Sequence, residues 1–216
     1  MLGGIAAVAS GGLVLFKAVL DLLVGEPPPT EPQLRLWLQT HHGLLAWTNE
    51  SLVVAAVLLT PVLPALYRRL DGPSRPWVGF GCGMLAAAIS VTLTLGIVHG
   101  RLMYPVYGID LDDHATAALL VSLYYGGAHE ATLLVGGALI MLSIAARQGP
   151  QGSVTATVGT GAGICQIAGA FPWLTGPLIA ACTQATLAAW LTYVGVLLLL
   201  SPRAGAASTS DAPPGS

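Results

Sequence analysis

The chain has 216 residues, of which 54% are hydrophobic and only 8% are charged, and its formal net charge is −2. Soluble domains carry about 25% charged residues, so this composition, with a mean hydropathy of +0.74, predicts a multi-pass protein of a cell membrane. Membrane lipid is then expected to surround the protein. The few basic residues form no cluster, which excludes nucleic acid as a partner.

Six stretches are apolar enough for helices that cross a membrane, since each crossing needs about 20 apolar residues. Continuous apolar runs such as 191–200 lack the alternation of barrel strands. We therefore predict an all-α fold, a polytopic bundle of six transmembrane helices forming one domain over 1–201, followed by a disordered cytoplasmic tail over 202–216. The predicted spans are 3–24, 46–67, 77–99, 118–146, 156–174 and 178–201.

The first span carries Lys17 and Asp21, and no Lys or Arg precedes it, so we expect it to stay attached rather than to be cleaved as a signal peptide. Lys17 and Asp21 are four residues apart and would neutralise one another on one helix face. Three prolines at 27–29 end this span. The stretch 34–38 that follows is expected to lie at the outer membrane interface, with Trp37 as an anchor.

The loops differ in their number of basic residues. Five arginines follow the second, fourth and sixth spans, whereas the opposite loops hold two. Basic residues favour the cytoplasmic side, so both termini are predicted to be cytoplasmic. The five are Arg68, Arg69, Arg75, Arg147 and Arg203, and the two are Arg35 and Arg101.

With this orientation, polar groups of four spans reach a similar depth in the outer half of the membrane. An ionisable group there costs about 2.5 to 3.5 kcal/mol, so groups kept in the membrane are functional candidates. Aromatic residues gather at the same depth, either as an interfacial belt or as the wall of a pocket. The candidates are Asp21, Trp47, Asn49, Glu50, His99, Arg101, Tyr104, Tyr125, His129 and Glu130.

The fourth span begins after an acidic loop, in which Asp112 or Asp113 is a suitable helix cap. The helix over 115–147 would be about 50 Å long and would project from the membrane or bend at Gly126 and Gly127. Residues three and four apart share a helix face. Polar stripes are therefore predicted on two helices, one through Ser122, Tyr125, His129 and Thr132, the other through Thr92, Gly96 and His99.

The leading hypothesis is a pocket for a small hydrophobic molecule. Asp21, Glu50 or Glu130, with His129, would then be the catalytic acids and bases of a lyase or isomerase, for example in isoprenoid cyclisation or isomerisation. Aromatic rings would support positive charge on the substrate. Its substrate-binding residues would be Trp47, Asn49, Arg101, Tyr104 and Tyr125.

Two alternatives stay open. His99 and His129 on neighbouring helices would be axial ligands of a haem, or would join Glu50 and Glu130 around a metal ion, although no HxxxH or HxxH spacing supports this. In the other alternative the same groups only pair with one another in a noncatalytic accessory subunit. No motif identifies a cofactor, a metal site or a protein partner.

Two sequence patterns carry a resemblance. HGRLMYPVYG at 99–108 followed by SLYYGGAHEATLL at 122–134 resembles small uncharacterised multi-spanning membrane proteins of bacteria, which implies the bacterial inner membrane but no activity. The matching positions are Arg101, Tyr104, Pro105, Tyr107, Gly126, Gly127 and His129. WTNE at 47–50 is similar to a motif of membrane-bound terpene cyclases, although spans five and six hold no acidic residue to match theirs.

Overall fold

A computed structural model describes residues 1–70, 74–108, 114–147 and 152–200. These residues form helices and no β-strand, which confirms the predicted all-α fold. The helices are α1 (Leu2–Val24), α2 (Glu31–Leu59), α3 (Val62–Arg69), α4 (Arg75–Met103), α5 (His114–Ala146), α6 (Gly152–Ala168) and α7 (Pro172–Leu200).

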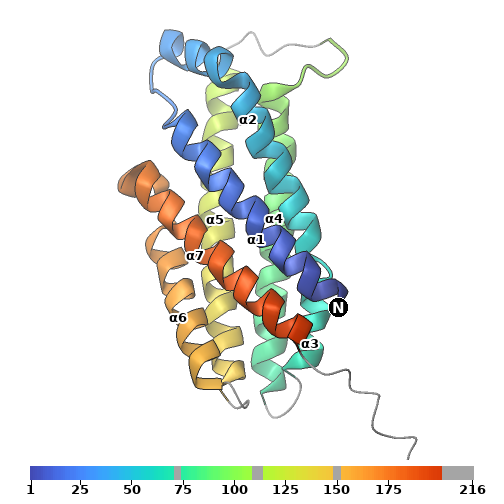
Figure 1. Cartoon of the computed structure of the whole chain (residues 1–216). Coiled ribbons are helices and arrows are strands. Elements are labelled where there is room, and N and C mark those ends of the chain that lie inside the picture. The colour runs from blue at the N-terminus through green and yellow to red at the C-terminus, as the bar shows by residue number, and fades with distance from the viewer. Residues whose placement is uncertain (71–73, 109–113, 148–151, 201–216) are drawn as a thin grey trace, which may run out of the picture.

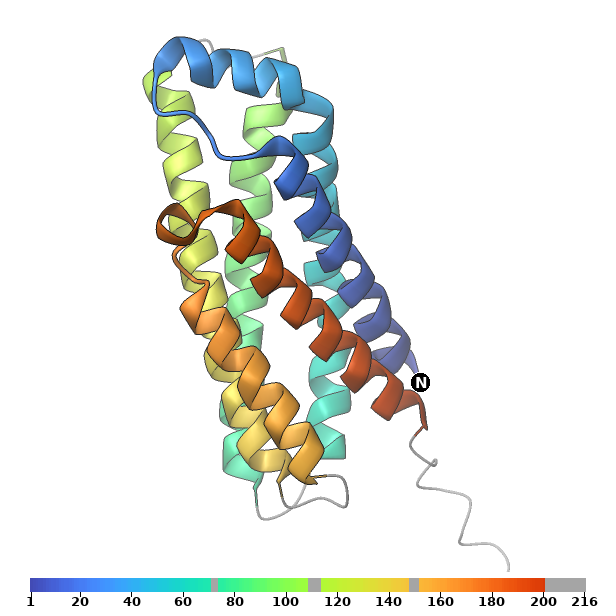
Figure 2. The ribbon, with the colours of Figure 1, turned by 60° about the vertical axis from the view of Figure 1, so that its left-hand side comes forward.

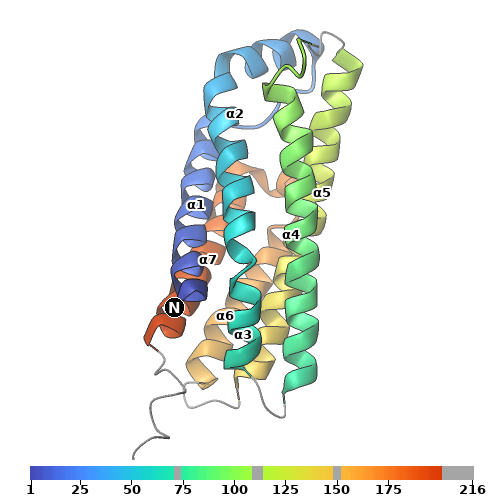
Figure 3. The ribbon, with the colours of Figure 1, turned by 90° about the vertical axis from the view of Figure 1, so that its right-hand side faces the viewer.

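The long helices form a closed ring (Figures 1 and 3). In order around it, α1 packs against α2, α2 against α4, α4 against α5, α5 against α6, α6 against α7, and α7 against α1. The short helix α3 continues α2 beyond Pro61 and packs against α1 and α4. The N-terminus and the last turns of α7 lie toward the same end of the ring, the lower end in Figure 1.

The main hydrophobic core fills the lower part of the ring. Its members come from all seven helices, and α3, the start of α4, the last turns of α5 and the second half of α7 lie together there (Figure 1). Burial of such side chains contributes about 1.5 to 3 kcal/mol each. The core therefore closes the lower end of the ring with side chains such as Val62, Val78, Leu139, Trp190 and Leu191.

The segment before the second span is the start of α2, because the helix runs without interruption from Glu31 to Leu59. Its first turns cross the upper end of the ring (Figure 2). The indole Nε1 of Trp37 donates a hydrogen bond to the carbonyl of Val24 at 3.0 Å. This contact joins α2 to the end of α1.

Among the described residues, five helices are long and apolar enough to cross a membrane. The predicted fifth span, 156–174, corresponds to α6, which has 17 residues and ends at Ala168. Residues 172–174 belong instead to α7, in which Gly176 leaves the helical conformation with φ 78° and ψ 170°. The sixth crossing therefore stays a prediction.

Helix α5 has 33 residues, which agrees with the long helix predicted over 115–147. It stays helical through Gly126 and Gly127, and Gly127 lies against Leu95 of α4, so its small size permits close packing rather than a bend. The cap predicted at Asp112 or Asp113 and the tail at 202–216 lie outside the described residues.

Candidate functional site

The upper part of the ring encloses a cavity of about 340 Å³, which we call the upper chamber. Residues of α1, α2, α4, α5 and α7 and of the loop after α1 line it, and most of its wall is apolar. A cavity of this size in an apolar wall with a few polar groups is typical of small-molecule sites. The polar side chains in the wall are Lys17, Asp21, Glu26, Thr48, His99, Tyr124, Tyr125, Thr132, Thr183 and Gln184.

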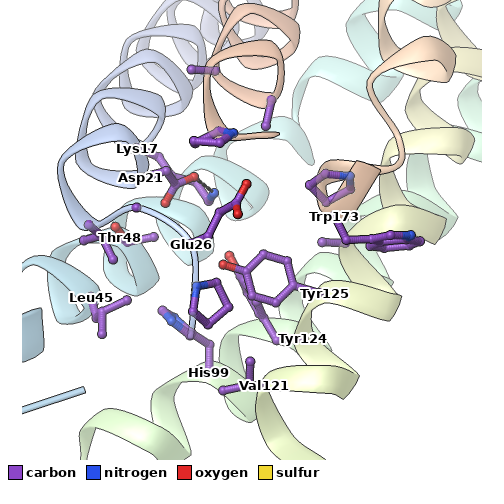
Figure 4. Close-up of a pocket in the computed structure, with 18 of the residues that line it drawn as sticks. Lys17, Asp21, Glu26, Leu45, Thr48, His99, Val121, Tyr124, Tyr125 and Trp173 are labelled. Atoms are coloured by element: carbon purple, nitrogen blue, oxygen red, sulfur yellow. Dashed lines mark hydrogen bonds and ion pairs between the residues drawn. The ribbon is translucent and has the colours of Figure 1, made fainter. Parts of the chain in front are cut away.

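Lys17 and Asp21 form an ion pair on the chamber wall (Figure 4), with Nζ and Oδ2 2.5 Å apart. The Lys17 side chain is 9% exposed and the Asp21 side chain 41% exposed. A buried charge is stable only when it is paired, so Asp21 is what keeps Lys17 charged inside the ring. The predicted neutralisation across one helical turn is confirmed.

His99 lies beside this pair and is buried. Its ring stacks on Tyr124 with 4.5 Å between centroids and 25° between planes. No hydrogen bond satisfies its Nδ1 atom, and the hydroxyl of Thr48, also buried in the chamber wall, has no partner either. A buried polar atom without a partner costs about 1 to 3 kcal/mol. Such atoms in a cavity wall point to a ligand that supplies the missing hydrogen bonds.

The labelled side chains divide the chamber into two sides (Figure 4). Lys17 and Asp21 lie on one side and Trp173 on the other, with the rings of Tyr124 and Tyr125 between them. The two tyrosine rings pack edge to face at 5.4 Å. A molecule in the chamber would therefore meet charged groups at one end and aromatic surface at the other.

Of the sequence-predicted site residues, Asp21, His99 and Tyr125 line this chamber. Its wall does not include Glu50, Glu130, His129, Trp47, Asn49, Arg101 or Tyr104. Glu50 and Glu130 are exposed on the outside of the ring, and Trp47 is 64% exposed. Asn49 is buried, but it lies against Gly100 of α4.

Three of these residues meet outside the chamber. The Tyr104 hydroxyl donates to Oε1 of Glu50 at 3.1 Å, and Nη1 of Arg101 donates to the Tyr104 carbonyl at 3.0 Å. Partial burial, together with the hydrogen bond and the negative charge of Glu50, raises the pKa of Tyr104 above its usual value. This cluster joins α2 to the end of α4, and it is separate from the chamber.

His129 fastens the turn between α6 and α7 to α5. Its Nδ1 donates to the carbonyl of Ala170 at 2.7 Å, because a carbonyl only accepts. The ring also packs against Phe171 and Trp173, with 4.6 and 5.4 Å between centroids. His99 and His129 therefore do not share the chamber wall, and no group of three or more His, Cys, Asp or Glu suited to a metal occurs in the described ranges.

Several chamber residues were missed by the sequence analysis. Thr48 and Gln184 were not candidates. Tyr124 counted only among the aromatic residues that gather at this depth, and Lys17 mainly as the partner of Asp21. The signal was present on α5, because Val121, Tyr124, Ala128 and Thr132 recur at three and four residues and all line the chamber. The predicted stripe on this helix took Ser122 and His129 instead, neither of which lines it.

Comparisons with known protein families, with curated proteins and with solved structures found no match to this chain.

Proposed function

We propose that the chain is an integral membrane protein whose upper chamber binds a small, mainly apolar molecule with a neutral polar end. One observation carries the proposal. His99 Nδ1 and Thr48 Oγ1 are buried without hydrogen-bond partners, and both residues line a mainly apolar cavity. In this proposal a hydroxyl or carbonyl group of the bound molecule supplies the missing hydrogen bonds, and the aromatic and aliphatic wall surrounds the rest of the molecule.

The electrostatics of the chamber favour a neutral ligand. Lys17 and Asp21 neutralise each other, so neither offers a net charge to an ionic ligand. Glu26 adds a carboxylate to the wall, which disfavours an anion. Bringing an uncompensated charge into such a site costs several kcal/mol. Hydroxyl and carbonyl heads avoid this cost and still accept or donate hydrogen bonds.

The orientation that we propose has six crossings, with both termini in the cytoplasm and the chamber in the outer half of the membrane. Five apolar helices support membrane insertion. Helix α3, the start of α4 and the end of α5 lie at the lower end of the ring in Figure 1. They carry Arg68, Arg69 and Arg75, and Arg147 directly follows α5. This concentration of arginines favours a cytoplasmic lower end.

Acid–base chemistry on the bound molecule is a second candidate function. It is favoured by the position of His99, whose unpartnered Nδ1 belongs to the chamber wall close to an ion pair. His99 would accept or donate the proton in an isomerisation. Asp21 is paired as a carboxylate with Lys17, so it is a poor proton donor for a cyclisation, and Glu50 and Glu130 lie outside the chamber wall.

Photolabelling tests the binding proposal. The probe is decanol with a diazirine beside its hydroxyl end, added to the purified protein in phosphatidylcholine nanodiscs, and the labelled residues are identified by mass spectrometry. We expect labelling of Tyr124, which stacks on His99, and of the adjacent Tyr125. Thr48→Val and His99→Leu should each reduce it about fivefold or more, the equivalent of one lost hydrogen bond.

Thr94→Val is the matched control, because Thr94 is exposed on α4 and its hydroxyl donates to the carbonyl of Ser90. It should leave the labelling unchanged. Labelling that avoids the chamber residues, or that is the same in all three variants, would rule out the proposed site.

A further inference from the structure

A second cavity, of about 100 Å³, lies deeper in the ring, and we call it the lower chamber. Five residues line both cavities, so the two chambers adjoin, and we call the boundary that these residues form the neck. The neck residues are Lys17, Tyr124, Ala128, Thr132 and Gln184. On α4 the combined lining runs from Leu102 to Leu85, which is about 25 Å along the helix axis.

The wall of the lower chamber is mainly apolar. Leu85, Ala88 and Ile89 of α4, Ala56 of α2 and Val135 of α5 all belong to it. Buried Ala56, Leu85 and Ile89 pack in one hydrophobic cluster with Ala138, and these three form the floor of the chamber. Such a wall favours the aliphatic part of a ligand, because burial of apolar surface is favourable.

Three polar side chains of the lower wall donate to the protein's own backbone. Ser51 donates to the carbonyl of Trp47 at 2.7 Å, Thr132 to that of Ala128 at 2.7 Å and Gln166 to that of Thr183 at 2.7 Å. Among the described residues, three buried polar side-chain atoms have no hydrogen-bond partner. His99 Nδ1 and Thr48 Oγ1 belong to residues of the upper wall, and Asn49 Oδ1 belongs to a residue of neither wall.

We infer that the ligand is a single-chain amphiphile, whose neutral head lies in the upper chamber and whose apolar chain passes the neck into the lower one. This inference rests on the proposed function and adds the class of ligand, such as a long-chain or prenyl alcohol. The small volume of the lower chamber admits one chain. Lys17 and Tyr124 mark the point where the lining changes from polar to apolar.

Two probes test the inference in phosphatidylcholine nanodiscs. Both are hexadecanols, one with a diazirine beside the hydroxyl and one with a diazirine at the far end of the chain. We expect the first to label upper-chamber residues such as Tyr125, and the second to label Leu85, Ile89 and Val135. Ala88→Leu, which fills the lower chamber, should reduce labelling by the second probe about fivefold or more, the equivalent of about 1 kcal/mol of overpacking.

Ala87→Leu is the matched control, since Ala87 precedes Ala88 on the same helix and is exposed. It should leave the labelling by both probes unchanged. If thermal unfolding shows that Ala88→Leu does not fold, Leu85→Ala is used instead. This variant enlarges the floor of the lower chamber, so labelling by the far-end probe should extend to Ala138.

The outcomes separate this inference from the proposed function. If the head-end probe labels the upper chamber while the far-end probe labels only lipid-facing residues, the chain does not enter the lower chamber and the inference fails alone. If the head-end probe does not label the upper chamber either, the proposed function fails with it. Equal effects of Ala88→Leu and Ala87→Leu also overturn the inference.

Discussion

At the scale of residues, the Lys17–Asp21 pair is unequally buried. The Lys17 side chain is almost fully enclosed by protein, whereas the Asp21 side chain is 41% exposed. A charge that loses its partner is costly in proportion to how completely water is excluded from it. The two members of the pair should therefore respond differently to mutation.

We predict that Asp21→Asn lowers the free energy of unfolding by about 3 kcal/mol, because it leaves an unpaired buried ammonium. Lys17→Met should cost less, since the Asp21 carboxylate that remains is less completely buried than the Lys17 ammonium. The double variant with Met at both positions should recover much of the loss. Denaturant unfolding in detergent measures all three. A Lys17→Met variant as unstable as Asp21→Asn would contradict this view of the pair.

The Tyr104–Glu50 hydrogen bond predicts a pH dependence in the alkaline range. Because the pKa of Tyr104 is raised in the folded protein, its contribution to stability is complete below the usual tyrosine pKa of about 10 and is lost as the pH rises through the folded value. The melting temperature should fall more steeply above about pH 10 in the wild type than in Tyr104→Phe. If the melting temperatures of the two proteins fall equally with rising pH, the prediction is wrong.

At the scale of elements, glycines set the distance between α5 and α6. A Cβ atom on Gly136 would lie 2.9 Å from the carbonyl oxygen of Gly163, and one on Gly163 would lie 2.8 Å from that of Gly136. These distances leave no room for a side chain on either helix. Close packing through small residues is common where membrane helices pair.

We predict that Gly136→Leu destabilises the protein by about 1 to 3 kcal/mol, because α6 must move away from α5. Gly126→Leu, on the same helix, is the control, since no atom lies within 4 Å of a Cβ there. Thermal unfolding of both variants in one detergent makes the comparison. Equal melting temperatures would show that the contact between the two glycines does not limit the packing.

The break in α7 rests on a different property of glycine. Gly176 has φ 78° and ψ 170°, a conformation that other residues adopt only with strain. The space around it is open, since a Cβ atom there would lie 3.7 Å from Oε1 of Glu26. We predict that Gly176→Ala costs about 1 to 3 kcal/mol from backbone strain alone. Gly161→Ala on α6, which is helical and unobstructed, should be neutral or slightly stabilising in the same thermal assay.

The sequence located most helices because long apolar runs are a strong signal, and it placed Asp21, His99 and Tyr125 correctly near one site. It misplaced the boundary between α6 and α7, because Phe171 and Trp173 continue the apolar pattern through the turn. On α5 the predicted stripe was right for Tyr125 and Thr132, which line the chamber, but not for Ser122 and His129, which do not. A helix in a membrane can turn any side toward its neighbours. Which side of α5 faces the chamber, that of Tyr124 or that of Ser122, is therefore decided by contacts with the other helices.

At the scale of the whole molecule, the ring explains why Glu50 and Glu130 resemble site residues in the sequence. Their position along the helices is close to that of the chamber residues Thr48 and Ala128, but their side chains are exposed. Depth follows from counting residues along one helix, whereas the inside of a ring is defined only once all its members are packed.

The proposed orientation is testable with single cysteines in a protein whose native cysteines are replaced by serine. Tyr107 is 100% exposed beyond the end of α4, and Arg69 is exposed at the end of α3. We predict that an impermeant maleimide labels Tyr107→Cys but not Arg69→Cys in intact cells, and both after the cells are opened. The reverse pattern would place the chamber in the cytoplasmic half of the membrane.

The brevity of α6 has a consequence for the surrounding bilayer. Its 17 residues span about 25 Å, whereas the hydrocarbon core is about 30 Å thick. The turn that follows it lies well below the upper end of α5 (Figure 2). If α6 crosses the membrane, the lipids beside it must thin to meet it, at a cost of a fraction of a kcal/mol per Å of hydrophobic mismatch. The flank formed by α6 and α7 would then prefer short-chain lipids, and the protein would be sorted toward thinner membranes.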